Sequence, residues 1–174
     1  LVATLADERE AVRDECISLL TSLTPTSREL QKLVAFENAF ERIFAIMAVD
    51  GSLSNGGRTV EDCLILLANL LRRNSSNQSL FRESGCILSL ASLFDDLLRS
   101  QSSGEDVAIW AQTQCERNIY AFLAVLRLFF IPGSAGISIN QETFWNHGLV
   151  RDTLQLAFSR AGQIAIKAEV RERR

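Results

Sequence analysis

Glycine and proline are scarce in this chain, and their scarcity excludes several fold classes. The 174 residues include 9 glycines and 2 prolines, half of the roughly 12% that these two residues contribute to an average protein. So few turn-forming residues argue against an all-β fold, which needs many tight turns. Hydrophobic residues make up 47% of the chain, which excludes a disordered chain. The composition therefore indicates one helical domain, or part of one.

The chain also lacks a strong net charge, paired metal ligands and long apolar runs. Its formal net charge of −3 gives no global electrostatic reason to bind nucleic acid or an anionic membrane. His147 is the only histidine, and no two cysteines form a Cys-x-x-Cys pair, so the usual zinc ligand spacing is absent. The apolar stretch 119–131 is too short to span a bilayer. We expect no metal, no cofactor, no nucleic-acid partner and no transmembrane segment.

Nothing in the sequence has the pattern of a catalytic site. His147 is followed by Gly148, which is typical of a helix end rather than of a general base. The glycine-rich segments 55–57 and 133–136 lack the lysine and preceding strand of a phosphate-binding loop. The four cysteines lie among apolar residues, which favours reduced, buried thiols in a cytoplasmic protein. We therefore expect that the protein is not an enzyme.

Apolar residues recur at the spacing of an amphipathic helix over most of the chain. In the segment 60–71 they follow an i, i+3, i+4, i+7 order, and the opposite side is apolar too. We expect that helix to be covered by neighbours on several sides. Similar patterns predict helices over 7–23 and over a long segment that contains 118–131. About eight helices are expected, separated mainly by the turn-forming segments 50–57, 100–104 and 132–140.

An internal repeat emerges when the sequence is compared with itself at an offset of 47 residues. Cys16 then matches Cys63, and Gln31 matches Gln78. Further apolar matches at the same offset are Leu19 with Leu66, Leu20 with Leu67, Leu23 with Leu70, Leu33 with Leu80 and Ile43 with Leu90. A period of about 40–47 residues with two or three helices per unit is typical of armadillo and HEAT proteins.

The sequence therefore predicts an all-α fold, an armadillo-like right-handed α-solenoid of about 3.5 repeats that is a fragment of a longer superhelix. The approximate units are 1–50, 51–100, 101–161 and the start of a further unit at 162–174. Stacked units bury one another's apolar faces, so a piece without its capping repeats should be sticky or marginally stable.

Three strings carry a resemblance to a known family. They are the opening LVATLADEREAVRDECISLL, the string LVAFENAFERIF at Leu33–Phe44, and VEDCLILLANLLRRNSSNQSLFRESG at Val60–Gly85. Together they resemble the armadillo-like globular head of the Uso-type vesicle-tethering factor, in the general vesicular transport factor family. The resemblance is best over 1–94, and the third unit matches by architecture.

The resemblance implies a function without catalysis. Members of this family are long cytosolic homodimers with a globular head, a coiled-coil tail and an acidic end. They tether vesicles between the endoplasmic reticulum and the Golgi, act with a Rab-family GTPase, SNAREs and golgin or coat partners, and associate peripherally with those membranes. Dimerisation would use regions outside this chain. The alternative is another cytosolic armadillo or HEAT adaptor, such as a transport receptor or a cytoskeletal regulator.

Peptide-binding armadillo proteins carry a ladder of tryptophan and asparagine side chains on successive helices. Asn69 stands at such a ladder position here, but Ile65 stands where a tryptophan would be expected. The ladder is thus broken, and we expect Trp110 and Trp145 to be packing residues. If a partner-facing groove operates, it should be basic and polar, suited to an acidic or helical segment. Its candidate residues are Ser18, Ser22, Asn69, Arg72, Arg73 and Arg127.

Overall fold

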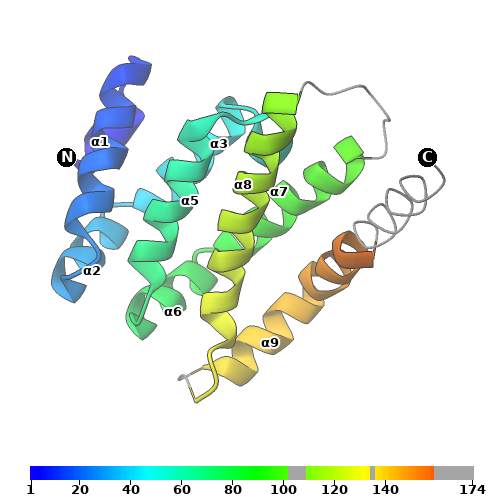
Figure 1. The fold of residues 1–174 in the computed structure, drawn as a ribbon. Coiled ribbons are helices and arrows are strands. Elements are labelled where there is room, and N and C mark those ends of the chain that lie inside the picture. Colours follow the sequence, from blue (N-terminus) through cyan, green and yellow to red (C-terminus); the bar gives the residue numbers. More distant parts are fainter. Residues whose placement is uncertain (102–108, 134–135, 159–174) are drawn as a thin grey trace.

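The computed structural model describes residues 1–101, 109–133 and 136–158, and every regular element in these ranges is helical (Figure 1). The first unit contains η1 Val2–Ala6, α1 Glu10–Leu23, α2 Arg28–Phe36 and α3 Ala39–Val49. The following elements are α4 Ser52–Asn55, α5 Arg58–Leu71, α6 Ser75–Glu83 and α7 Cys86–Gln101. The last are α8 Ile109–Arg127, η2 Leu128–Phe130 and α9 Ile137–Asn146, after which residues 149–158 are also helical. The prediction of an all-α fold is confirmed.

The structure shows the same helices twice, at the offset found in the sequence. Arg28 and Ser75, which begin α2 and α6, are 47 residues apart. The two helices also share their N-terminal cap, since Ser27 Oγ accepts a hydrogen bond from the N–H of Leu30 and Asn74 Oδ1 accepts one from the N–H of Asn77. A serine and an asparagine at matched positions therefore start matched helices.

The helices α1, α5 and α8 lie side by side as one layer of the solenoid (Figure 1), with α5 in contact with both neighbours. The side chains Val60, Cys63, Leu64, Leu67 and Leu71 of α5 are all fully buried. The expectation that this helix is covered on several sides is confirmed. An apolar helix in the centre of the stack thus supplies the largest part of the contact between repeats.

A row of phenylalanine rings also links the repeats. The ring centroid of Phe81 on α6 lies 5.0 Å from that of Phe40 on α3 and 5.5 Å from that of Phe129 in η2. The Phe129 ring in turn lies 5.3 Å from that of Phe144 on α9. Such offset and edge-to-face contacts between rings stabilise the fold beyond the free energy that burial of the rings contributes. The row therefore connects three successive repeats.

Buried amides fix the turns between helices. Gln31 Nε2 donates to the carbonyl of Thr24, and Gln78 Nε2 donates to that of Leu71, each at 3.0 Å. The second bond repeats the first 47 residues later. Both carbonyls lie at the end of a helix, where no intrahelical donor is available. One glutamine in each of the first two repeats thus donates to a carbonyl at the end of a helix.

Three local predictions differ from the structure. The long helix does not continue through Ile131, because α8 ends at Arg127 and a 3-10 turn follows that buries Phe129 in the ring row. The predicted loop 132–140 ends early, because α9 begins at Ile137. The predicted loop 50–57 contains the short helix α4. The segment 102–108 lies outside the described residues, as does the unit predicted at 162–174.

The first repeat exposes positions that the second repeat buries. Leu66 and Leu70 on α5 are fully buried, whereas their counterparts Leu19 and Leu23 on α1 are 47% and 43% exposed. The helix α1 forms one end of the row in Figure 1. At the other end, an apolar groove of about 360 Å³ lies between α8, α9 and residues 149–158. Both ends of the described stack therefore present apolar surface.

Candidate functional site

The six residues predicted to line a partner-facing groove do not share one environment. The exposed members are Ser18, Ser22, Arg72, Arg73 and Arg127. Asn69 is only 8% exposed, and its Nδ2 donates to the backbone carbonyl of Thr21 at 3.2 Å. The amide at the ladder position therefore ties α5 to α1. The hydroxyl of Ser22 likewise donates within α1, to the carbonyl of Ser18.

Three of these residues, Arg72, Arg73 and Arg127, lie at or just after the C-terminal ends of α5 and α8, and we call them the arginine edge. Arg72 and Arg73 lie in the turn between α5 and α6, and Arg127 ends α8. The two places are close, because Gln78 Nε2 of α6 donates to the carbonyl of Leu128 at 3.5 Å. In the part of the chain that the structure describes, none of the three guanidinium groups forms an ion pair. Their positive charge is available to a partner.

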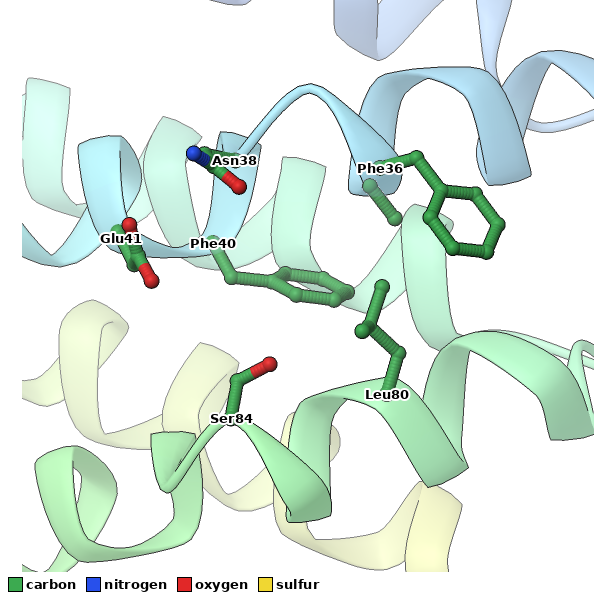
Figure 2. Close-up of a pocket in the computed structure, with 7 residues that line it drawn as sticks. Phe36, Asn38, Phe40, Glu41, Leu80 and Ser84 are labelled. Atoms are coloured by element: carbon green, nitrogen blue, oxygen red, sulfur yellow. The ribbon is translucent and has the colours of Figure 1, made fainter.

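A second surface feature was not found by sequence reasoning. A pocket of about 160 Å³ lies between the α2–α3 turn of the first repeat and α6 of the second (Figure 2). Its lining residues are Ala35, Phe36, Asn38, Phe40, Glu41, Leu80 and Ser84. The sequence does contain one relevant difference between the repeats. At the 47-residue offset, the small residue Ala35 is aligned with the long residue Arg82.

Cys16, Cys63 and Cys86 are buried thiols whose pKa values burial raises, so they have little tendency to ionise. Burial, with a smaller contribution from the carboxylate of Asp50, raises the pKa of the Cys63 thiol to about 12. Burial also raises the pKa of the Cys86 thiol to about 11. A thiol with so high a pKa is a poor nucleophile at neutral pH. His147 is exposed and directly follows α9, as predicted for a helix end.

Trp145 is not the packing residue that the sequence suggested. Its side chain is 72% exposed, whereas Asn140 and Phe144 of the same helix are buried. Residues four apart share one face of a helix, so the buried pair sets the inward face of α9 and turns residue 145 away from it. The prediction for Trp145 is wrong, and the side chain of Trp110 lies outside the described ones.

The fold and its repeated caps define this chain as an α-solenoid of armadillo-like repeats. No protein-family model matches it. The intracellular protein transport protein USO1 of Saccharomyces cerevisiae is 37% identical over 158 residues, which are 91% of this chain and 8% of the yeast protein. The general vesicular transport factor p115 of Homo sapiens is 40% identical over 153 residues, 87% of this chain and 15% of the human protein.

The solved structures agree with these relatives. A crystal structure of Uso1 superposes with a TM-score of 0.81 at 38% identity, covering 90% of this chain and 22% of that one. This chain belongs to the Uso1/p115 family of vesicular transport factors. It spans less than a quarter of the length of each of these proteins. In the described residues, no helix has the length and apolarity needed to cross a membrane.

Proposed function

We propose that this chain is a section of the head of a vesicle-tethering scaffold that works without catalysis between the endoplasmic reticulum and the Golgi. The observation that carries the proposal is similarity to vesicular transport factors over nearly the whole chain, in both sequence and fold. That similarity favours a tether over a transport receptor or a cytoskeletal regulator. The protein would act at the cytoplasmic face of Golgi and transport-vesicle membranes, to which its partners attach it.

The mechanism that we propose is presentation of a rigid surface. Buried amides that bond from one repeat to the preceding one, such as those of Asn69 and Asn77, and the ring row hold successive repeats in fixed positions. Exposed residues on different repeats therefore keep a constant spacing. A partner can then contact several repeats at once, and the solenoid itself loses little conformational entropy on binding. The proposed units remain 1–50, 51–100, 101–161 and the start of another at 162–174.

The partners that we propose are proteins, namely a Rab-family GTPase, SNAREs and golgin or coat components. The arginine edge is the candidate contact, because its exposed guanidinium groups can pair with an acidic or helical segment. Ser18, Ser22 and Asn69 remain part of the proposed surface, although the Asn69 amide already bonds to α1. Homodimerisation would depend on regions beyond this chain.

A pull-down with the complete parent head tests the proposal. We expect the head to retain a Rab-family GTPase loaded with a GTP analogue and to release the GDP form. Charge reversal in Arg72→Glu/Arg73→Glu should weaken GTPase or SNARE binding about tenfold or more. Lys32→Glu/Arg117→Glu, which reverses two exposed charges on α2 and α8 that form no ion pair in the described residues, is the matched control. Equal retention of both nucleotide forms, together with no SNARE binding, would contradict the proposal.

A further inference from the structure

The pocket of Figure 2 lies at the joint between the first and second repeats, where Ala35 is one of the lining residues. In the second repeat, Arg82 extends from α6 and donates to Asn140 Oδ1 of α9 at 2.6 Å and to Ser79 Oγ at 3.2 Å. Its side chain therefore occupies the joint between the second and third repeats. The matched residue of the first repeat is Ala35, whose methyl group cannot reach across the joint.

The two ends of the pocket differ in chemistry. Figure 2 shows Phe36 and Leu80 at one end, with the ring of Phe40 between the two repeats. Phe40 is buried, but Phe36 is 64% exposed. Phe36 and Leu80 give this end of the pocket an apolar rim. This end can therefore accept an apolar group.

The other end of the pocket is polar and open to solvent. Asn38, Glu41 and Ser84 lie there (Figure 2), and none of their side chains has a hydrogen-bond or ion-pair partner among the residues described. Glu41 is the only charged residue that lines the cavity. Glu37 and Glu83 are exposed and adjoin lining residues along the chain. The free polar groups at this end are suited to a cation with hydrogen-bond donors.

We propose that this pocket binds a basic helical segment of a partner protein. One apolar side chain of the segment enters between Phe36 and Leu80, and a lysine or arginine three or four residues away pairs with Glu41. The size agrees, because a protein cavity of about 150 Å³ accommodates a benzene molecule, and this pocket measures about 160 Å³. Residues three or four apart share one helix face, so a single helix can present both side chains to the pocket. The pocket is separate from the arginine edge, so its function does not depend on the tethering role.

Two variants and one control isolate the pocket. Ala35→Met fills the cavity with a flexible apolar side chain, and Glu41→Lys reverses the charge at its polar end. Glu142→Lys makes the same charge change at an exposed position on α9 and is the control. Glu41 is exposed, so its variant should fold even if Ala35→Met does not. Circular dichroism melting identifies any variant that is not folded.

The probe is a phage-displayed library of 14-residue helical peptides, panned on the 174-residue chain. We expect enriched peptides to carry an apolar residue followed by lysine or arginine at the third or fourth position. Fluorescence anisotropy of the synthetic peptides should show affinity at least tenfold weaker for Glu41→Lys and Ala35→Met, and unchanged for Glu142→Lys. A library that yields no binder overturns the proposal, as do peptides that bind the two pocket variants as tightly as the unaltered chain.

Discussion

Asn77 holds two repeats together, and replacing it should lower stability by a predictable amount. Its side chain is fully buried at the first turn of α6. The amide Nδ2 donates to the carbonyl of Leu70 at 2.8 Å and to that of Gln31 at 3.0 Å. One acceptor therefore belongs to α5 and the other to α2 of the preceding repeat. The substitution Asn77→Ala removes both donors at once.

The magnitude follows from the two acceptors. The Leu70 carbonyl lies in the last turn of α5, where no intrahelical donor is available. Leaving it buried without a partner costs about 1–3 kcal/mol, and the lost bond to Gln31 adds about 1 kcal/mol. Asn77 Oδ1 accepts no hydrogen bond, so its removal offsets part of that loss. We expect a net loss of about 2 kcal/mol, which lowers Tm by roughly 4–8 °C for a chain of this size.

Thermal unfolding followed by far-ultraviolet circular dichroism measures this effect. Asn77→Asp should destabilise more than Asn77→Ala, because it places a carboxylate against two carbonyl oxygens in a buried site. Asn146→Ala, at the exposed end of α9, should change stability by less than about 0.5 kcal/mol. A Tm for Asn77→Ala within about 2 °C of the unaltered chain, or equal effects of alanine and aspartate, would refute the reasoning.

Three further predictions follow from burial. Phe81→Ala should cost about 3–5 kcal/mol in urea unfolding because it interrupts the ring row, whereas exposed Phe158→Ala should cost little. Half-buried Cys115 should react with iodoacetamide at pH 8 before Cys63. The Cys63 thiol has a pKa of about 12, so about one thiol in 10⁴ is ionised at that pH. Mass spectrometry of samples taken over time measures the order of reaction. Leu19→Lys should reduce self-association of the chain in analytical ultracentrifugation, because it places a charge on the exposed apolar surface of α1. An unchanged sedimentation profile would show that this surface does not drive self-association.

The solenoid could be predicted because its signal occurs more than once. A single amphipathic helix indicates only itself, but Gln31 and Gln78 recur at a fixed offset together with the apolar positions around them. In the structure each glutamine makes the same bond to a helix-ending carbonyl. The sequence pattern therefore records a repeated physical requirement, namely a partner for a buried carbonyl.

The surface was harder to predict, because it depends on how the repeats pack. The ladder position of Asn69 was identified from the sequence, but only the position of α1 shows that its amide bonds to Thr21. The register of α9 likewise depends on which residues meet the ring row, so the exposure of Trp145 could not be deduced from apolar spacing alone. The pocket is lined by residues of two repeats, such as Ala35 and Leu80, so it appears only once the repeats are packed together.

A vesicle-capture assay tests the central claim most directly. The complete parent head is immobilised on beads, and captured endoplasmic-reticulum-derived vesicles are counted for the unaltered head, for Arg72→Glu/Arg73→Glu and for the control Lys32→Glu/Arg117→Glu. We predict that the unaltered and control heads capture vesicles equally and that reversal of the arginine edge reduces capture at least fivefold. Capture that is absent from the unaltered head, or is undiminished by the double reversal, would contradict the account.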